Sequence, residues 1–355
     1  MVNEKLLFKF LIDKLYRHNF LTEDEIVFIL ENIYLYGNDY LIQKANETRI
    51  KSYGTRVYMR GLIEISNYCK NKCKYCGINA LNSKVHRYRL TPDEILECCE
   101  KGYSLGFRTF VLQSGEDSYF TDSILESIII EIKRRYLDVA VTLSIGERDY
   151  ESLKKLLESG ADRYLLRHET INEELYDSIH VNSSYENRIK SLWNLKEIGY
   201  QIGAGFMVGI PNQTKMDLAR DLIFLKELDP EMVGIGPFIP HKDTVYRDEA
   251  AGRLEDTITM LALTRLFLPN ALIPSTTALA SIHENGRELG LKAGANVVMP
   301  NLSPMDVRED YALYDGKAYQ GYEGAECINL LEKRINKIGY IVDMSRGDNI
   351  EWKIQ

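Results

Sequence analysis

The sequence predicts an α/β protein built as a (β/α)8 TIM-type barrel with an N-terminal helical extension. From residue 57 onward, short runs rich in β-branched residues alternate with longer amphipathic segments, which is the pattern of repeated βα units. The first run leads into a cysteine-containing loop, whereas a doubly wound open sheet would need a glycine-rich turn there. A closed barrel of this class needs eight strands, and we predict them at 57–66, 109–114, 139–145, 162–167, 201–209, 231–238, 271–276 and 295–300.

We expect the chain to divide into three parts: residues 1–55 as a helical extension, 56–304 as the barrel, and 305–355 as a C-terminal segment that closes the barrel. A capping box marks one helix of the extension, because Thr22 is followed three positions later by Glu25 and then by an apolar face. No low-complexity segment and no linker rich in Pro, Gly or Ser interrupts the chain, so we expect one continuous barrel.

Helical segments separate the predicted strands, and several carry their own start and stop signals. One begins at Thr91 as N-cap, with Pro92 at the first helical position and Glu94 at the third. Another, DYESLKKLLESG, stops at Gly160. The segments SYENRIKSLWNLKEIG and TKMDLARDLIFLKEL also have the apolar periodicity of helices.

Composition and charge narrow the class of protein. The 355 residues carry a formal net charge of −8 without a basic stripe, which disfavours nucleic acids and anionic membranes as partners. The N-terminus lacks the apolar region and cleavage site of a signal peptide, and no stretch approaches the roughly 20 apolar residues of a membrane span. We therefore expect a cytoplasmic protein, in which the six cysteines remain thiols available to metal.

Three of these cysteines, Cys69, Cys73 and Cys76, follow the first predicted strand with the spacing C-x3-C-x2-C. Thiolates suit both zinc and iron–sulfur clusters. A structural zinc site would need a fourth ligand, and the nearest downstream histidine is His86. A redox pair of Cys73 and Cys76 would normally begin a helix in a smaller fold and needs no third cysteine. A [4Fe–4S] cube held by three thiolates keeps one iron free for a small molecule.

Nearly every predicted strand ends in polar residues, glycine or proline, and function in such barrels sits at the C-terminal strand ends. The third strand carries Thr142 and Ser144, and the fourth ends in RHET, which contains Arg167 and Glu169. A carboxylate there can accept both hydroxyls of a ribose, although a buried structural ion pair between Arg167 and Glu169 is the alternative. The later strands end in FMVGIPNQT, GPFIPH, PSTTA and MPNLSP.

The cysteine spacing after the first strand of a βα barrel resembles that of the radical S-adenosylmethionine (SAM) superfamily. The resemblance implies that the cysteines hold one [4Fe–4S] cluster, whose open iron is chelated by SAM. It further implies that SAM is cleaved reductively to a 5′-deoxyadenosyl radical, with the cofactor supplying the chemistry and the protein positioning it. The residues that it implies for cofactor binding are Tyr75, Ser114, Gly115, Glu116, Ser144, Glu169, Arg188, Met207 and Ile210.

A closer resemblance, to the HydE family of [FeFe]-hydrogenase maturases, rests on YCKNKCKYCG, RYRLTPDEI, VLQSGED, DRYLLRHET, GIGPFIPH, IPSTTA and AGANVVMPN. It covers about residues 20–320 and implies a monomeric barrel with a deep internal cavity. The implied substrate is an iron carbonyl–cyanide–cysteine precursor, whose sulfur the radical attacks on the way to the bridging dithiolate of the diiron subcluster. A reductant protein and transient contact with other hydrogenase maturases are implied as well. The residues implied to line the substrate cavity are Thr142, Arg167, Met232, Thr276, Thr277 and Tyr311.

The chain departs from some family members in one respect. Their three additional C-terminal cysteines hold a second cluster, whereas Cys327 alone stands in this region here, so we expect no second cluster. We expect Cys327 to be a buried helical residue and the adjacent Cys98 and Cys99 to belong to the core. The alternatives are a methylornithine synthase-like enzyme, a biotin synthase-like enzyme, and a non-catalytic iron–sulfur or zinc carrier.

Overall fold

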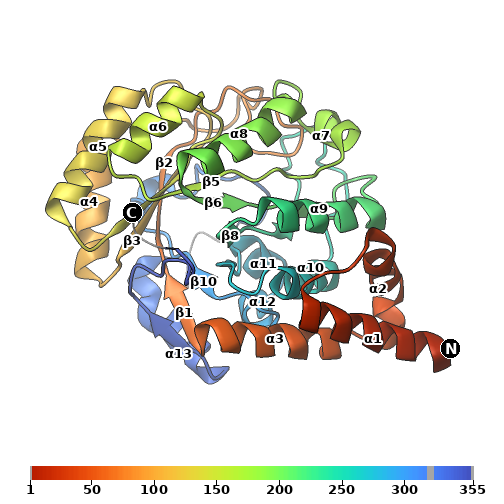
Figure 1. The fold of residues 1–355 in the computed structure, drawn as a ribbon. Helices are drawn as coiled ribbons and strands as arrows, with labels where there is room; N and C mark the ends of the chain where they lie inside the picture. The colour runs from red at the N-terminus through yellow and green to blue at the C-terminus, as the bar shows by residue number, and fades with distance from the viewer. Residues whose placement is uncertain (1, 318–323, 353–355) are drawn as a thin grey trace.

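The computed structural model describes residues 2–317 and 324–352 (Figure 1). The segments predicted as strands form a ring, in which residues 271–276 contribute isolated bridges and no named strand. The helices surround this ring, and the largest apolar core lies between the two. The strands are β1 (Arg56–Met59), β2 (Gly61–Ser66), β3 (Thr109–Ser114), β4 (Ala140–Ser144), β5 (Arg163–Leu165), β6 (Gln201–Ala204), β7 (Met207–Val208), β8 (Met232–Val233), β9 (Gly236–Pro237), β10 (Val297–Val298) and β11 (Ile341–Asp343).

Parallel pairing closes the ring. Six strands pair in the order β2-β3-β4-β5-β6-β8, and β1 and β2 together form the first barrel strand. A bridge from Met232 to Leu272 adds the seventh position, and a bridge from Pro274 to Val297 adds the eighth. Because β10 pairs in parallel with β1, the eighth position returns to the first. The prediction of a (β/α)8 barrel is confirmed.

The helices begin and end largely where local signals placed them. Capping boxes at Thr22 and Thr91 are both formed, and Gly160 has a φ of +111° just beyond its helix. The helical elements are α1 (Val2–His18), α2 (Glu23–Tyr36), α3 (Asp39–Tyr53), α4 (Pro92–Ser104), α5 (Asp122–Arg135), α6 (Tyr150–Glu158), α7 (Glu173–Ile179), α8 (Tyr185–Ile198), α9 (Lys215–Leu228), α10 (Leu254–Phe267), α11 (Thr277–Ile282), α12 (Gly286–Lys292), α13 (Ile328–Lys337) and the 3-10 turns η1 (Met305–Val307) and η3 (Ala325–Cys327).

Besides the first predicted strand, which forms β1 and β2, the predicted strands 201–209 and 231–238 are each split in the structure. Residues 201–204 and 232–233 belong to the ring, whereas β7 and β9 form a separate parallel pair beyond it. Gly205 lies at the break with a φ of +151°, and a Cβ there would lie 1.9 Å from the carbonyl oxygen of Gly234. The backbone of Gly234 therefore approaches Gly205 so closely that no side chain fits at position 205.

The N-terminal helices lie along the lower edge of the barrel in Figure 1. Helix α3 packs on α10, and α2 packs on α9. The buried Arg49 of α3 donates to the carbonyl oxygens of Ala295 (3.0 Å), Gly54 (2.9 Å) and Arg56 (2.7 Å). One guanidinium thus ties the helical extension to the first and eighth barrel strands. No helix in the described ranges is long and apolar enough to cross a membrane.

The last described residues enter the N-terminal end of the barrel. Strand β11 pairs with β1, and the following turn carries Asp348 to the buried Arg163 (2.5 Å) and to the amide of Gln201 (2.9 Å). The proposed segment 305–355 includes residues 318–323 and 353–355, which lie outside the described residues.

We predict that Asp348→Asn lowers stability at neutral pH by about 3 kcal/mol, as expected when one partner of a buried ion pair is removed. Burial alone would raise the pKa of the Asp348 carboxyl, but Arg163 and hydrogen bonds from Arg346 and Gln201 hold it well below its usual range. The stabilisation is therefore complete above the unfolded pKa of about 3.9 and is lost as the pH falls below it. Urea unfolding of both proteins at pH 7 and pH 3 should show a difference that shrinks in acid.

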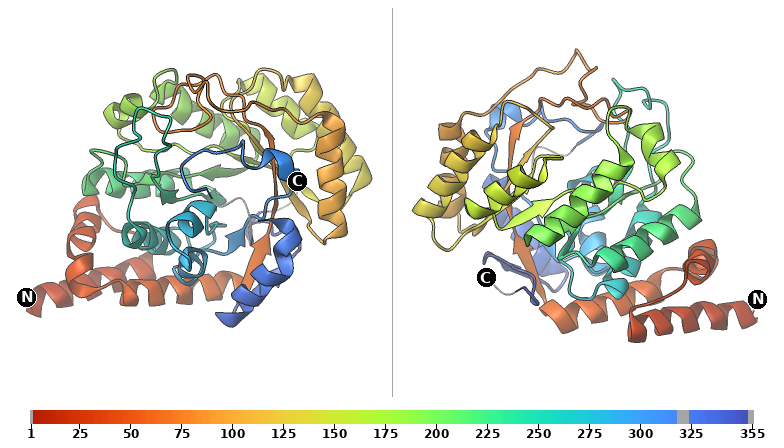
Figure 2. Two further views of the ribbon diagram at one scale, coloured as in Figure 1. Left: turned by 180° about the vertical axis from the view of Figure 1, so that it is seen from behind. Right: turned by 45° about the horizontal axis from the view of Figure 1, so that its top comes forward.

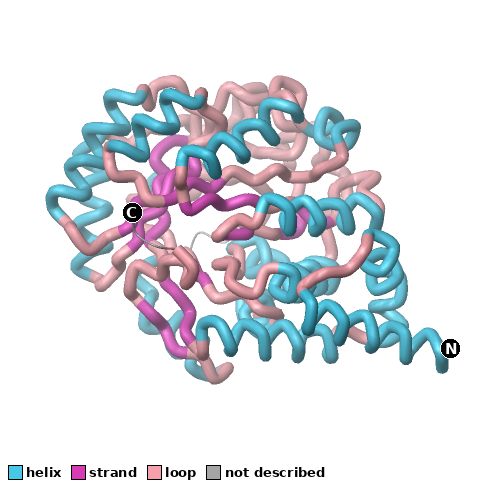
Figure 3. Tube along the Cα trace, in the orientation of Figure 1, coloured by secondary structure: helices cyan, strands magenta, loops and turns pink. Residues whose placement is uncertain are grey.

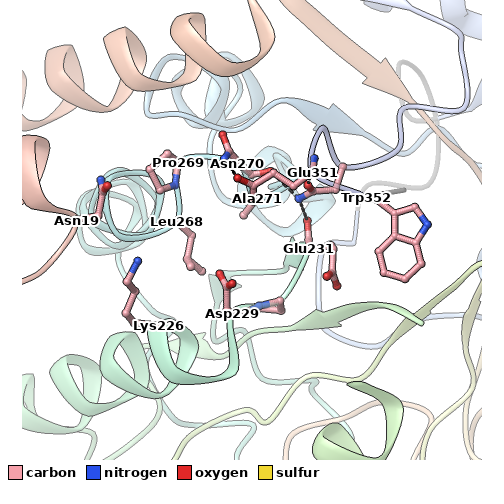
Figure 4. A pocket seen from close by; sticks show the side chains of 12 residues that line it. Asn19, Lys226, Asp229, Glu231, Leu268, Pro269, Asn270, Ala271, Glu351 and Trp352 are labelled. Atoms are coloured by element: carbon pink, nitrogen blue, oxygen red, sulfur yellow. Dashed lines mark hydrogen bonds between the residues drawn. The ribbon is translucent and has the colours of Figure 1, made fainter. Parts of the chain in front are cut away.

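A polar pocket of about 330 Å³ opens at this same N-terminal end (Figure 4). Its lining includes Asp229 and Glu231, which immediately precede β8, together with Asn270 and Trp352. The cysteine segment follows the C-terminal end of β2, so the two features lie at opposite ends of a parallel barrel. Barrels of this class place function at the C-terminal end, which is the end that carries the cysteine segment.

Candidate active site

The cysteine loop lies at the C-terminal mouth of the barrel, among the loops gathered at the top of Figures 2 and 3. Three backbone N–H groups of the loop are bound by other parts of the mouth. Lys70 donates to Glu116 (3.0 Å), Lys74 to Ile179 (3.0 Å) and Gly77 to Leu313 (2.8 Å). The loop is therefore held by the end of β3, by α7 and by the segment after η1. Cys69, Cys73 and Cys76 are all partly exposed.

A single arginine, which sequence reasoning missed, closes the loop on itself. Nη1 of Arg87 donates to the carbonyl oxygens of Asn67 and Ile78, and Nη2 donates to those of Asn79 (2.7 Å) and Asn82 (3.2 Å). These acceptors lie on both sides of the three cysteines in the sequence. A planar guanidinium with several donors is suited to such a role.

The three thiols fit an iron–sulfur cluster. Burial raises the pKa of Cys76 to about 12, and burial also raises the pKa values of Cys69 and Cys73. For Cys73 the two neighbouring thiols add to the shift. A bound cluster supplies the positive charge that stabilises such thiolates. Within residues 2–317 and 324–352, no three Cys, His, Asp or Glu side chains are grouped so as to hold one metal ion. A cube instead takes thiolates at separate corners.

The predicted segment Ser114 to Glu116 lies directly against the cysteine loop. A Cβ on Gly115 would lie 2.3 Å from the carbonyl oxygen of Tyr68 and 2.7 Å from Cβ of Cys69, so only glycine allows this approach. The hydroxyl of Ser114 donates to its neighbour's carbonyl oxygen (2.6 Å). The carboxylate of Glu116 lies 3.2 Å from Lys70, and its backbone carbonyl accepts from the same residue.

Arg188 reaches the same region from α8 and is buried. Its Nε donates to Glu147 at 2.5 Å, and its Nη1 donates to the carbonyl oxygen of Arg167 at 2.7 Å. Nη2 lies 3.9 Å from Glu116. Sequence reasoning missed Glu147, although it stands only three positions beyond Ser144, the predicted cofactor residue at the end of β4. Position near a strand end was the available signal.

Tyr75, Met207 and Ile210 come together as an apolar group. Met207 and Ile210 pack with Phe238 in one buried cluster, and Tyr75 packs against it. The hydroxyl of Tyr75 lies 3.2 Å from Nε2 of His180, whose Nδ1 lies 3.2 Å from the carbonyl oxygen of Tyr176. That carbonyl can only accept, so Nδ1 carries the proton and Nε2 accepts from Tyr75. Burial lowers the pKa of His180 to about 3, which keeps the ring neutral.

The RHET segment holds a carboxylate in an unusual backbone conformation. Glu169 has a φ of +68°, uncommon for a residue with a side chain, and lies 3.1 Å from Arg167. Its backbone is held on both sides, because its N–H donates to Gly205 (3.0 Å) and its carbonyl accepts from Met207 (3.1 Å). Strain that persists under such support is typical of functional positions.

Helix α9 anchors the RHET segment through Asp217 and Asp221, which were not predicted from the sequence. Nε2 of His168 lies 3.4 Å from Oδ1 of Asp221, and both side chains are fully buried. The same oxygen accepts from the N–H of Ile171 at 2.6 Å. One turn earlier, Asp217 accepts from the amide of Asn172 at 2.7 Å. Glu169 therefore points its side chain from a turn that is anchored to the surrounding helices.

Three buried oxygens at predicted site positions have no hydrogen-bond partner within the described residues. They are Oε2 of Glu169, Oγ1 of Thr142 and Oγ1 of Thr276. Buried polar atoms in folded proteins are nearly always paired, so unpaired oxygens at this mouth fit contacts to a polar ligand. Thr277 is the first residue of α11, directly after Thr276.

The other predicted substrate residues lie at different depths. Met232 lies lower in the barrel, where its sulfur accepts from Nη1 of Arg60 at 3.0 Å. Tyr311 lies near the mouth, and its hydroxyl is 3.3 Å from the amide of Gln113 on β3. The structure thus gathers the mouth residues around the cysteine loop, while Met232 lies below them.

The remaining cysteines differ in part from expectation. Cys98 and Cys99 are buried in the core, as predicted. The prediction that Cys327 is a buried helical residue is wrong, because it is partly exposed and ends the 3-10 turn η3 before α13. Its neighbour Glu326 forms an ion pair with Arg308 at 2.7 Å.

Comparison with known proteins agrees with this site. Residues 63–225 match the radical SAM superfamily. The chain is 48% identical to the [FeFe] hydrogenase maturase subunit HydE of Thermotoga maritima, over 85% of this chain and 86% of that one. It is 31% identical to the 3-methylornithine synthase of Methanosarcina barkeri, again over 85% and 86% of the two chains.

A solved structure extends the comparison to the fold. The crystal structure of methylornithine synthase (PylB) superposes with a TM-score of 0.81 at 26% identity, over 94% of this chain and 97% of that chain. The sequence relationship to the maturase is closer than that to the synthase, at 48% against 31% identity. The chain is therefore a radical SAM enzyme and belongs to the HydE family of [FeFe]-hydrogenase maturases.

Proposed function

We propose that this enzyme cleaves SAM reductively and uses the resulting radical to assemble the dithiolate bridge of the hydrogenase diiron subcluster. The substrate would be an iron carbonyl–cyanide–cysteine precursor. One observation supports the proposal most directly. The three-cysteine loop lies at the same barrel mouth as the buried oxygens of Glu169 and Thr276 that lack hydrogen-bond partners within the described residues. The 48% identity to a HydE maturase supports the assignment to this pathway of assembly.

Each group of residues has a role in this proposal. The three cysteines hold one [4Fe–4S] cluster, and the cluster with SAM supplies the 5′-deoxyadenosyl radical. Tyr75, Met207 and Ile210 flank the adenine, since they already form one apolar group. Glu169 accepts the ribose hydroxyls through its unpaired oxygen. The cofactor's amino and carboxylate groups lie among Ser114, Gly115, Glu116, Ser144 and Arg188.

The substrate would lie deeper, among residues that offer donors for anionic ligands. Arg167 supplies a guanidinium, and Thr142 and Thr276 supply hydroxyls that lack protein partners within the described chain. Thr277, Met232 and Tyr311 complete the proposed lining. Since Cys327 is the one cysteine after residue 99, we propose a single cluster.

The proposal also includes partners and a place of action. A reductant protein would deliver the electron, and other hydrogenase maturases would exchange substrate or product in transient contacts. We propose that the enzyme acts as a monomer in the cytoplasm, without nucleic acid or membrane partners.

The first experiment tests the radical chemistry. Reconstituted protein reduced with dithionite should release 5′-deoxyadenosine from SAM, and Cys73→Ala should abolish this release because the cluster loses a ligand. Cys327→Ala is the matched control and should retain activity, since that cysteine stands outside the loop. Wild-type protein that carries a full cluster and cleaves no SAM would contradict the proposal.

The second experiment tests the substrate. The protein should support hydrogenase maturation in a defined mixture that lacks its HydE component. Maturation failure together with activity on lysine would move the assignment to a methylornithine synthase-like enzyme, the class of the 31% identical relative.

A further inference from the structure

Two glycines just beyond the sixth barrel strand, Gly234 and Gly236, lack the structural reasons that explain every other glycine in residues 2–317 and 324–352. Each of the others either has a φ between +20° and +160° or would place a Cβ within 3.0 Å of another atom. Gly234 and Gly236 meet neither of these conditions. The nearest atoms to their Cβ positions lie at 3.7 Å and 3.4 Å, which are ordinary contact distances. The backbone therefore permits side chains at both positions.

The Cβ position of each glycine lies next to a predicted substrate residue. The Cβ position of Gly234 lies 3.7 Å from Cδ of Arg167 and 4.0 Å from Cδ1 of Leu165. The Cβ position of Gly236 lies 3.4 Å from Oγ1 of Thr276. Ile235 between them is fully buried in the core, on the opposite face of the strand. We call the surface formed by Gly234 and Gly236 the glycine wall.

The glycine wall disfavours folding and gives no conformational advantage in return. The N–H of Gly234 donates to Ala204 at 2.9 Å, Gly236 pairs in register with Met207, and neither glycine has a φ between +20° and +160°. Glycine in extended backbone is less favourable to folding than alanine, because it has more conformational freedom in the unfolded chain. What the two positions do provide is space next to Arg167 and Thr276.

We propose that the glycine wall is the surface against which the substrate of the radical packs, and that it sets the size limit of that substrate. This inference rests on the proposed function and adds its specificity-determining residues. Arg167 at one end and the unpaired hydroxyl of Thr276 at the other define a compact ligand with anionic or hydrogen-bond-accepting groups. The glycine wall itself offers van der Waals contact and no hydrogen bond from Gly234, because the N–H of Gly234 already donates to the carbonyl oxygen of Ala204.

The test adds one methyl group at a time. Gly234→Ala and Gly236→Ala should each lower the product formed per 5′-deoxyadenosine released by about 10- to 100-fold, the effect of one methyl group in a fitted pocket. The assay is hydrogenase maturation with the reconstituted protein, with SAM affinity measured by equilibrium dialysis on the same samples. The midpoint of thermal unfolding should be unchanged or raised, which separates the effect from misfolding.

The matched control is Ile235→Val, on the opposite face of the same strand. It should lower the midpoint of thermal unfolding slightly and leave the product ratio unchanged, because Ile235 is buried in the core on the opposite side of the chain from the two glycines. If wild-type protein matures hydrogenase and both alanine variants do so with an unchanged product ratio, the glycine wall is wrong while the proposed function stands. Wild-type protein that is inactive in maturation overturns the proposed function and this inference with it.

Discussion

Arg87→Met is expected to lower the iron retained by reconstituted protein at least tenfold, with a parallel loss of SAM cleavage. The guanidinium binds four carbonyl oxygens on both sides of the three cysteines, at Asn67, Ile78, Asn79 and Asn82. A hydrogen bond to a charged group contributes about 1.5–3 kcal/mol, and 1.4 kcal/mol is a factor of ten in binding. Iron content and the absorbance of the cluster after gel filtration measure the effect.

We call the four hydrogen bonds of Arg87 the clamp. Two further variants separate the effect of the clamp from the effect of a positive charge alone. Arg87→Lys should rescue little, because one ammonium cannot reach four carbonyls that a planar fork binds together. Lys84→Met removes a positive charge from the same loop but only an exposed ion pair with Asp243, so it should keep its cluster. Full iron content in the Arg87→Met protein, or equal losses from both variants, would refute the role of the clamp.

The barrel could be predicted from the sequence because its signals are local. Alternation of strand and helix patterns, two capping boxes and the cysteine spacing each depend on a few neighbouring residues. The breaks after β6 and β8 could not be predicted, since they arise where Gly205 meets the backbone of Gly234 on a neighbouring strand. The 3-10 turn that places Cys327 before α13 likewise gave no local signal in the sequence.

The candidate site shows the same division. Residues at strand ends, such as Thr142 and Glu169, could be named because the topology of a barrel gathers those ends. The residues that hold these side chains in position could not be predicted from the sequence. Arg87 acts on carbonyl groups, which carry no sequence signal, and Asp221 reaches His168 across 53 residues from the middle of an ordinary amphipathic helix.

A buried ion pair between Lys317 and Glu64, far apart in the sequence, gives the largest effect on stability that we expect. Nζ of Lys317 lies 2.5 Å from Oε1 of Glu64, and Nδ2 of Asn301 lies 2.8 Å from its other oxygen. The pair links the segment after η1 to β2 inside the barrel. The same ammonium donates to the carbonyl oxygen of Tyr311 at 2.7 Å, so it also positions a proposed substrate residue.

Lys317→Met is expected to lower the free energy of unfolding at pH 7 by about 3–5 kcal/mol, because it leaves the Glu64 carboxylate buried without its counter-charge. The double variant Glu64→Gln with Lys317→Met should recover most of the loss, since replacing both members of a buried pair is often nearly neutral. Urea unfolding of the wild type, both single variants and the double variant gives the coupling energy directly.

The matched control is Lys14→Met, which makes the same side-chain change at a partly exposed ion pair with Glu25. That pair should contribute less than about 1 kcal/mol. Because the double variant removes the lysine that binds Tyr311, it should regain stability without regaining full product formation. A double variant with restored stability and wild-type activity would show that Lys317 serves the fold alone. If the Lys317→Met protein is as stable as the wild type, the Glu64 carboxylate is solvated in the variant. Other contacts would then hold the segment after η1 in position.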